Sequence, residues 1–553
     1  MSDLNQFASL GAHGNSEQNC QRDLLQKLPK LLAPEPYLVE VPLIVLQDNK
    51  KEMVVKDIPV LLPHEWFASM LETDLIDFIC GGTKVESFWS QTPLDDPRLF
   101  ENPMMDIEDW HSKVVPFLLH ADAAPHQNKD TINILSFRSI LSNLGISESQ
   151  LMIAALPESC RASTKTCSAL GLKDFDGDTW DNIWDAVVWS FNQLLLGRWP
   201  DQDHKGKPFP AGSKRALKAG SKLGQGVDLL GIVWIITGDL KHLSVEWGLA
   251  SHSSLTPCFK CACNKSTIPF NDFRQNAKWK QTIFTPEYYK LCPPTEHKLM
   301  DILGVSGFTF FYDPTHCLEI GVAGHTIANV LFDIFHFELH GVKAERLQKL
   351  FNLIRDAYDQ LGITSGRLSR LELSYFSTPS APFKNFPDIM HSAIKARQCR
   401  YLAPVALKLC KDYHNEANQY SKHRLACLEN LNIMYDLVDP HPVFLPASQQ
   451  TLYAAAVEKF LLQYSACARI AQNLGKLQWS VVPKHHCVAH FPAQSKMQSP
   501  RAFWAYGGEH MVGDIAELAA SCLNGTPAHL MPSTLVLKYR VAMHLFFETA
   551  VPS

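Results

Sequence analysis

KVVPFLLHAD, residues 113–122, is the stretch from which the fold of this chain follows most directly. It is an almost unbroken apolar run that ends in a carboxylate, which predicts a buried strand with Asp122 at its end. DLLGIVWIITGD, residues 228–239, has the same pattern, and predicts a second buried strand that ends at Asp239. Two acidic side chains are therefore expected where two core strands meet solvent.

The segments around these two strands predict the rest of a mixed α/β core. INILSFRSIL (132–141) and SQLMIAALP (149–157) are candidate strands, and residues 179–199 repeat Trp, Ile, Val and Phe at helical spacing. Further upstream, residues 36–63 contain two β-branched runs separated by a polar turn, and residues 64–80 are typical of an amphipathic helix. The order strand, strand, strand, helix, strand indicates an α/β fold.

Bulk composition places the chain among folded globular proteins. Of its 553 residues, 46% are hydrophobic and 19% are charged, which is enough apolar material for a sizeable core. The net charge of −5 means that contact with nucleic acid would need local basic patches. The polar N-terminus and the odd number of cysteines, 15, predict an intracellular protein with mostly free thiols and no membrane role.

Five regions are expected along the chain. Residues 1–20 are expected to form a disordered leader, 21–110 an N-terminal α/β region, and 111–265 the first part of the core. Residues 266–480 are expected to form a mainly helical insertion, with helical periodicity over 320–475, and 481–553 is expected to return to the core with a helix that begins near Glu509.

Carboxylates held at strand ends suit phosphodiester chemistry. Two divalent metals about 4 Å apart can stabilise both the attacking and the leaving oxygen, and hard Mg²⁺ or Mn²⁺ needs oxygen ligands. An Asp after a strand is also a common turn or cap residue, so position alone leaves a structural role for Asp122 and Asp239 open.

Four blocks of sequence resemble the transposases of CACTA (En/Spm-type) elements and related transposon proteins of dinoflagellates. They are HADAAPHQNKDTINILSF, GDLKHLSVEWGLASHSSLTPCFKCACN, DPTHCLEIGVAGHTIANVLFD and FWAYGGEHMVGDIAEL, and they occur in the family's order within about residues 113–545. The resemblance implies a ribonuclease-H-like core (a mixed sheet with helices) that a large, mainly α-helical insertion interrupts.

The resemblance also implies a function and a site. The family is one of DDE-type DNA transposases, and Asp122, Asp239 and Glu509 match its three metal-binding carboxylates, with Glu517 as the alternative to Glu509. It implies Mg²⁺ or Mn²⁺ as cofactor, DNA ends and target DNA as partners, a homo-oligomer and a nuclear location. Asp313 and His316 match an accessory Asp/Cys-x-x-His motif.

A cysteine and histidine pattern predicts a second metal site. Cys258 and Cys261 form a Cys-x-x-Cys turn that can place two thiolates on one Zn²⁺, with Cys263 close by. His485 and His490, or His486 and His490, could complete it, and the set with His485 is preferred. This layout resembles the zinc site of Transib-type and V(D)J recombinases. Buried cysteines that pack as small apolar side chains are the alternative.

A basic segment precedes the second buried strand. Between residues 204 and 226 it has no acidic residue, and it contains Lys205, Lys207, Lys214, Arg215, Lys218 and Lys222. It could be a solvated loop or a phosphate-contacting loop beside the active site. Lys395, Arg397 and Arg400 are a second candidate nucleic-acid contact.

Three functions therefore compete. A DDE-type transposase, active or domesticated, is favoured by the four blocks. A non-enzymatic, transposase-derived nucleic-acid-binding or scaffold protein is favoured by the acidic net charge and by the lack of a recognisable DNA-binding module. A zinc hydrolase is disfavoured because the histidines lack the adjacent Glu of H-E-x-x-H.

Overall fold

The structure is a computed structural model of the 553-residue chain. It describes residues 31–47, 50–73, 75–80, 84–127, 130–142, 149–172, 175–224, 226–375, 385–389, 394–522 and 527–550. The leader expected at residues 1–20 lies outside the described residues.

A four-stranded mixed sheet forms the centre of the fold, as the apolar runs predict. Its strand order is β5–β4–β3–β6. β3 is antiparallel to β4 and parallel to β6, and β4 is antiparallel to β5. The strands are β3 (Val114–Gln127), β4 (Asp130–Ser139), β5 (Leu151–Pro157) and β6 (Leu230–Gly238). The chain is thus a mixed α/β protein with a mixed sheet.

β3 is longer than the sequence indicates. Asp122 was expected at its end, but β3 continues for five further residues to Gln127, because Ala123, Ala124 and Pro125 still pair with β4. β6 stops at Gly238, opposite Ala121. Asp122 therefore lies where β3 loses its β6 neighbour, inside a strand that is paired on one side only.

Helices cover both faces of the sheet. On one face Phe117 of β3 contacts Phe137 of β4, which contacts Phe191 of α8 (Thr179–Leu196), with ring centroids 5.5 and 5.8 Å apart. On the other face α20 (Tyr506–Ala520) packs along β3. Since successive side chains of a strand alternate between faces, odd-numbered residues of β3 face α8 and even-numbered ones face α20.

An antiparallel hairpin and three helices extend this layer. β1 (Tyr37–Gln47) pairs with β2 (Lys50–Val60), and α8 packs on β1. The single helix expected over residues 64–80 forms as two, α3 (Pro63–Leu71) and α4 (Ile76–Cys80). α21 (Met531–Ala550), which the sequence reasoning did not single out, packs on β2 and α20.

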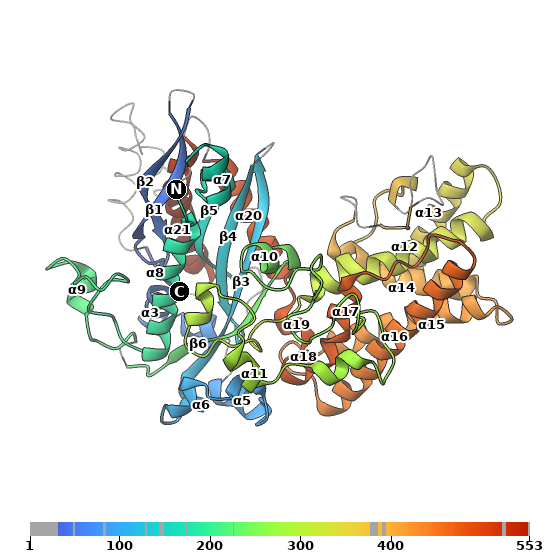
Figure 1. The fold of residues 1–553 in the computed structure, drawn as a ribbon, viewed down its shortest axis with the longest axis horizontal. Coiled ribbons are helices and arrows are strands. Elements are labelled where there is room, and N and C mark those ends of the chain that lie inside the picture. Colours follow the sequence, from blue (N-terminus) through green and yellow to red (C-terminus); the bar gives the residue numbers. More distant parts are fainter. Residues whose placement is uncertain are drawn as a thin grey trace.

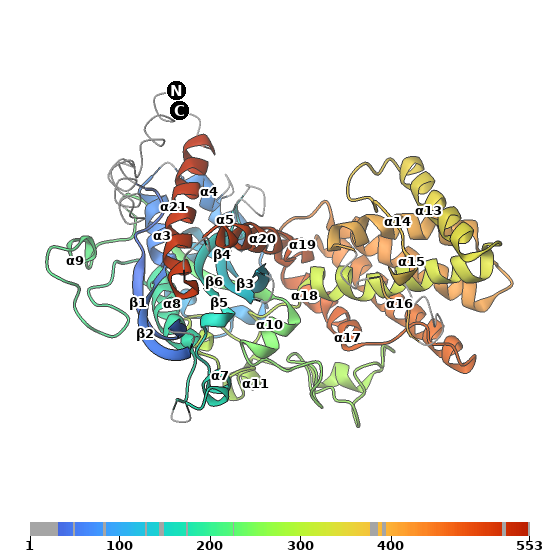
Figure 2. The same ribbon diagram turned by 90° about the horizontal axis from the view of Figure 1, so that it is seen from above.

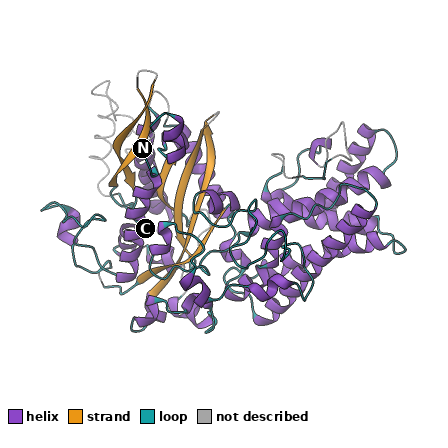
Figure 3. Cartoon of the chain, in the orientation of Figure 1, coloured by secondary structure: helices purple, strands orange, loops and turns teal. Residues whose placement is uncertain are grey.

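Long helices make up most of the other half of the molecule (Figures 1 and 3). Residues 266–314 contain only short helices, and the long helices begin at Thr315, close to residue 320, where the helical periodicity begins. The view in Figure 2 shows the same two halves side by side, with α18–α20 running between them. The main helices are η6 (Thr315–Ala323), α12 (Gly324–Asp333), α13 (Lys343–Gln360), α14 (Ala396–Asp412), α15 (Gln419–Val438) and α16 (Ala447–Asn473).

One buried arginine ties the two halves together. The guanidinium of Arg98 pairs with Asp96 at 2.6 Å and donates to the carbonyl oxygens of Trp234 in β6 and Met497 in α18 (Phe491–Met497) at 3.2 and 3.3 Å. It also lies 4.0 Å from the ring centroid of Trp234. Because its charge and donors are satisfied, Arg98 can stay buried at this junction.

The most apolar helical stretch is a core element. Residues Thr315–Glu338 are long and apolar enough to span a membrane, but 89% of the relevant window is buried inside the protein. None of the described cysteines forms a disulfide.

Candidate functional site

Two acidic side chains that are far apart in sequence meet at the centre of the sheet. Asp122 on β3 and Glu509 in the first turn of α20 place ligand atoms within 4.8 Å of each other and of a ring nitrogen of His120. His120 and Asp122 are two residues apart on β3, so both face α20. This group of His120, Asp122 and Glu509 could hold a metal ion.

Asp239 is close to this group but is not part of it. Ala121 of β3 pairs with Gly238 of β6, so Asp122 and Asp239 each follow the last pair of two parallel strands. The Asp239 carboxylate accepts a hydrogen bond from the backbone of Lys241 and caps α10 (Leu240–Val245). It is half-buried, and its oxygens are not among the ligand atoms that come within 4.8 Å of one another.

The two meeting carboxyl groups have opposite pKa shifts. Burial and the nearby Glu509 raise the pKa of Asp122 well above its usual value. Burial would also raise the pKa of Glu509, but the His316 imidazole outweighs it and lowers the pKa to about 2. One proton shared between two close carboxyl groups is the expected state when no cation lies between them.

His316 connects Glu509 to a fully buried acid. Its Nε2 is 3.2 Å from Oε1 of Glu509, and its Nδ1 is 2.6 Å from Oδ2 of Asp313. Burial lowers the pKa of His316, but the two carboxylates reverse this and raise it well above the usual value. Oδ1 of Asp313 accepts hydrogen bonds from the backbone of Thr315 and Ala505, which anchors the start of α20. The accessory pair thus orients Glu509.

Glycine at 508 allows α20 to approach β3. A Cβ at Gly508 would lie 2.4–2.6 Å from three atoms of the His120 ring, closer than real Cβ contacts. The ring itself is buried, and neither nitrogen has a hydrogen-bond partner among the described residues. Burial lowers the pKa of His120 to about 4. A neutral imidazole with a free lone pair therefore faces Asp122 and Glu509.

A second cluster joins the segment after α10 to the end of the helical half. Cys258, Cys261, His486 and His490 are buried, and their ligand atoms lie within 4.8 Å of one another. Sγ of Cys258 is 3.4 Å from Nε2 of His490, Sγ of Cys261 is 3.2 Å from Nε2 of His486, and the two imidazole nitrogens are 3.1 Å apart. Two thiols and two imidazoles at this spacing could hold a metal such as zinc.

His485, which the sequence reasoning preferred, faces away from this cluster. In α17 (Pro483–Ala489) and the turn after it, His486 and His490 are four residues apart and share one face, whereas His485 and His490 do not. The Nδ1 atom of His485 lies 3.1 Å from the backbone of Val482, and its ring packs on Tyr464 with centroids 4.3 Å apart. The structure therefore places the second pair of candidate ligands at His486 and His490.

Neighbouring groups support the four candidate ligands. Nδ1 of His486 is 2.9 Å from the carbonyl oxygen of Phe270, which leaves Nε2 for the cluster. The backbone of Lys260 and the hydroxyl of Tyr312 donate to Sγ of Cys258 at 3.2 and 3.3 Å. Burial would raise the pKa of Cys258, but contacts with Cys261 and Cys263 and the imidazoles bring it well below its usual value. A thiolate is the form that binds metal.

The basic segment lies at the other end of β6. It enters the strand at Leu230, whereas Asp239 follows the far end, about 27 Å away at the rise of an extended strand. Figure 1 shows α9 (Lys214–Lys218) at the edge of the molecule, away from α20. It is therefore not beside the candidate carboxylates.

Most cations of this segment have acidic partners elsewhere in the chain. Lys207 is exposed and has no ion pair among the described residues. The other five pair as follows: Lys205 with Glu40 (3.1 Å), Lys214 with Glu35, Arg215 with Glu65 (2.6 Å), Lys218 with Glu72 (2.8 Å) and Lys222 with Asp228 (2.8 Å). Of the second basic candidate, Arg400 pairs with Glu319 (3.0 Å) and with Asp439.

His120 is the site residue that the sequence reasoning missed. Its position two residues before Asp122 on a strand is the signal that could have revealed it, since residues i and i+2 share a face. Glu517, the alternative to Glu509, is exposed two turns further along α20.

Two comparisons with known proteins supply no assigned site that could be carried over to these clusters. No family model matches the chain, and no curated protein matches it.

Proposed function

We propose that this protein is a DDE-type DNA transposase, which cuts DNA and transfers the cut strand with the help of divalent metal ions. In this proposal the mixed sheet with α8 and α20 is a ribonuclease-H-like core, and the helical half is an insertion between β6 and α20. The DNA ends and the target are the partners, the protein works as a homo-oligomer, and the nucleus is its place of action.

The observation that carries the proposal is the meeting of two carboxylates from distant parts of the chain, with a third at the end of the adjacent strand. Asp122 and Asp239 occupy matching positions after the last β3–β6 pair, and Glu509 reaches Asp122 from α20. A chance surface cluster would not bury one of its acids, yet Asp122 is only 7% exposed. A buried, unpaired carboxylate is unfavourable unless it serves a cation or a reaction.

The donor set fits a divalent cation. Carboxylate oxygens of Asp122 and Glu509 suit Mg²⁺ or Mn²⁺, and a neutral His120 favours Mn²⁺ over Mg²⁺ because imidazole is the softer ligand. The raised proton affinity of Asp122 fits the same reading, since a cation can take the place of the shared proton.

The chain's own residues would divide the work in a simple way. Asp122 and Glu509 would hold the cation on the face under α20, and Asp239, which caps α10, would be the third carboxylate at the same strand ends. His316 keeps Glu509 oriented, and Asp313 keeps His316 oriented. When bound, divalent ions activate the attacking oxygen and stabilise the leaving one.

The cysteine and histidine cluster is proposed as a structural Zn²⁺ site. All four candidate ligands are buried, so no position is open for a substrate. Zinc here would fasten the segment after α10 to α17, and so hold the helical half in place relative to α20. A closed loop of this length makes such a clip effective.

Plasmid nicking tests the proposal. Supercoiled DNA that carries the genomic sequences flanking the gene is incubated with the purified protein and Mn²⁺ or Mg²⁺, and open-circular product is measured. Asp122→Asn and Glu509→Gln should each lower the nicking rate by about a thousandfold, and Glu517→Gln on the same helix should leave it unchanged. Metal-dependent nicking that survives Asp122→Asn would refute the assignment.

A non-enzymatic, transposase-derived DNA-binding or scaffold protein is the second candidate. The paired basic segment favours a scaffold role, because five of its six cations already have carboxylate partners and offer little free charge to DNA phosphates. DNA binding without any metal-dependent nicking would support this second candidate over the first.

A further inference from the structure

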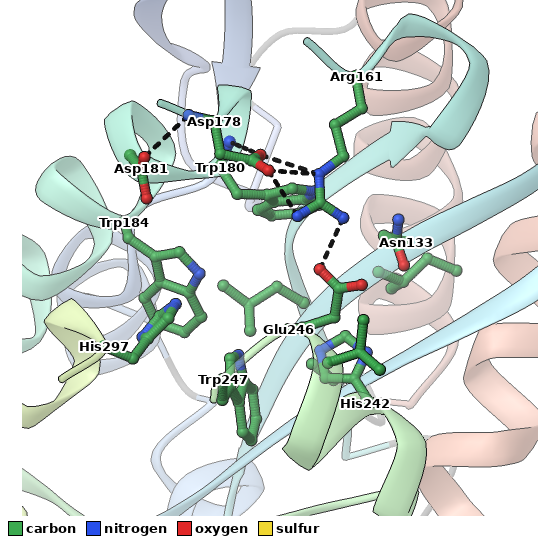
Figure 4. A pocket seen from close by; sticks show the side chains of 14 residues that line it. Asn133, Arg161, Asp178, Trp180, Asp181, Trp184, His242, Glu246, Trp247 and His297 are labelled. Carbon is green, nitrogen blue, oxygen red and sulfur yellow. Dashed lines mark hydrogen bonds and ion pairs between the residues drawn. The ribbon is translucent and has the colours of Figure 1, made fainter. Parts of the chain in front are cut away.

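A pocket of about 240 Å³ lies beside the candidate carboxylates, on the opposite face of β3 (Figure 4). Its floor includes Ala121, the residue before Asp122, and Ile134 and Leu135 of β4. One wall comes from α10 and the two residues after it, Glu246 and Trp247. Since α10 begins at Asp239, the pocket and the carboxylates share the two strand ends that support them.

The boundary between them follows from the length of the strands. β6 stops at Gly238 and the chain turns away into α10, whereas β3 continues alone to Gln127. Past Ala121 a helix, α10, and not a strand packs beside β3, so only β3 and α10 separate the pocket from the carboxylates at this edge.

Aromatic side chains line the pocket. Trp184 of α8 and Trp247 meet nearly at right angles, with centroids 6.1 Å apart and planes at 79°. His297 stands at 90° to Trp184, with centroids 4.9 Å apart. In Figure 4 the indole nitrogens of Trp184 and Trp247 are turned toward the middle of the pocket. Neither N–H has a hydrogen-bond acceptor among the described residues, and both side chains are buried, with Trp184 3% and Trp247 1% exposed.

Acceptors face these donors. Arg161 is held by Asp178 at 2.7 Å and by Oε2 of Glu246 at 2.7 Å, which leaves Oε1 of Glu246 without a protein partner in the described part of the chain. Asp181 accepts the backbone N–H of Asp178 through Oδ2, and its Oδ1 is likewise unused. The pocket lining thus holds three carboxylates, Asp178, Asp181 and Glu246, and one guanidinium, so its net negative charge repels a phosphate group.

The geometry points to an unstacked nucleobase as the ligand of this pocket, which we infer to be a base of the DNA strand that is held at Asp122 and Asp239. A base is flat and aromatic, and it offers both acceptors for indole N–H groups and amino or imino donors for carboxylates. The excess negative charge admits the base and excludes its phosphate, which stays at the carboxylate edge with its cation. This inference rests on the proposed function.

A methylated lysine is the rival ligand, because aromatic walls with carboxylates also recognise quaternary ammonium groups. It fits less well, since Arg161 already supplies a cation inside the pocket, and since two indole N–H groups turned inward would repel a second one.

Binding of free nucleosides tests the pocket without any cleavage. Titration calorimetry with the four deoxynucleosides should show that at least one binds to the wild-type protein without added Mg²⁺ or Mn²⁺. Trp184→Phe/Trp247→Phe, which keeps an aromatic ring at both positions but removes both donors, should weaken that binding by about tenfold. Trp189→Phe on the same helix is the control, because Trp189 packs on Tyr37 and His64 outside the pocket.

A single-stranded oligonucleotide tests the source of the base. Replacing one nucleotide at a time with an abasic site should weaken wild-type binding at one position, and the same replacement should have no effect in Trp184→Phe/Trp247→Phe. The source of the base is a DNA strand, and not a free nucleotide, if two results are obtained together. A nucleoside 5′-monophosphate should bind more weakly than the nucleoside, and the oligonucleotide should bind tightly.

Three results would overturn the inference: no deoxynucleoside binds, binding is equal in the double variant, or trimethyl-lysine alone binds in a Trp184- and Trp247-dependent manner. These results are distinct from failure of the proposed function, because nicking without pocket-dependent binding leaves the carboxylate site intact. Conversely, the protein could bind nucleosides in a manner that depends on Trp184 and Trp247 and yet never nick DNA. That result would support the proposed ligand of the pocket and contradict the proposed transposase activity.

Discussion

Nε2 of His316 lies 3.2 Å from Oε1 of Glu509, and the same imidazole is held from its other side by Asp313. The chain separates these residues by nearly 200 positions, yet η6 and α20 bring them together. A carboxylate on the first turn of a helix can rotate freely, so His316 gives Glu509 one orientation toward Asp122.

His316→Asn should therefore raise the metal concentration needed for half-maximal nicking by about 10–100-fold, because supporting hydrogen bonds contribute that much to metal sites. The measurement is the nicking rate as a function of Mn²⁺ concentration. His510→Asn is the matched control, since His510 is exposed and adjacent to Glu509. Equal Mn²⁺ dependence in the His316 and His510 variants would contradict the orienting role.

Two glycines of α20 should respond in opposite ways to alanine. Gly513 has open space around its Cβ position, so Gly513→Ala should stabilise the protein by about 0.5–1 kcal/mol through helix propensity. Gly508→Ala should destabilise it, because the new methyl group would meet the His120 ring. Urea denaturation of both variants measures the difference, and a stabilising Gly508→Ala would show that α20 packs less closely on β3 than described.

Two neighbouring histidines should differ in their effect on zinc content. His486→Ala should lower bound zinc well below one ion per chain, because His486 faces both cysteines, and His485→Ala should retain it, because His485 faces Tyr464. Elemental analysis after exhaustive dialysis gives the stoichiometry. Full zinc retention in His486→Ala, or complete loss in His485→Ala, would reassign the ligands.

Buried histidines should make the fold sensitive to acid. His64 is sealed against Ser190, 2.8 Å from its hydroxyl, and burial lowers its pKa to about 3. His64 therefore binds a proton near pH 6.5 in the unfolded chain but not in the folded chain. Its contribution to stability is fully present above pH 6.5 and is lost as the pH falls below that value. At pH 5 this single group lowers the free energy of unfolding by about 2 kcal/mol.

Urea midpoints of the wild type and His64→Gln between pH 7.5 and 5 test this effect. The variant should lose less stability on acidification, because it removes one group that titrates only in the unfolded chain. His111→Gln, at an exposed position, should follow the wild type. Parallel curves for wild type and His64→Gln would show that His64 is protonated in the fold.

Much of the sheet could be predicted from sequence, because its strands are continuous apolar runs. β3, β4, β5 and β6 all fall on the segments that hydrophobicity singles out. The end of β3 could not be predicted, since the alanines after Asp122 pair with β4 for reasons of register and not of composition. The pairing of strands likewise depends on contacts that no local pattern encodes.

The sequence indicated which types of residue form the candidate sites, but it indicated less well which of those residues lie next to one another. Cys258, Cys261 and His490 carry a spacing that indicates metal binding, but the choice between His485 and His486 depends on which face of α17 meets the cysteines. His120 escaped notice because a histidine within an apolar strand resembles a satisfied core residue. The ion pairs that neutralise the basic segment come from Glu35, Glu40, Glu65 and Glu72, far upstream.

The contact between Cys261 and His486 spans 225 residues, and this has a consequence for how the protein is made. At a synthesis rate of about 5–20 residues per second, a ribosome needs roughly 10–45 seconds to proceed from one half of this cluster to the other. During that time the cysteines lack their histidine partners, and β3 lacks its contact with α20 for still longer. Any chain released before residue 506 thus lacks α20 and Glu509, so an unfinished copy cannot form the candidate carboxylate site.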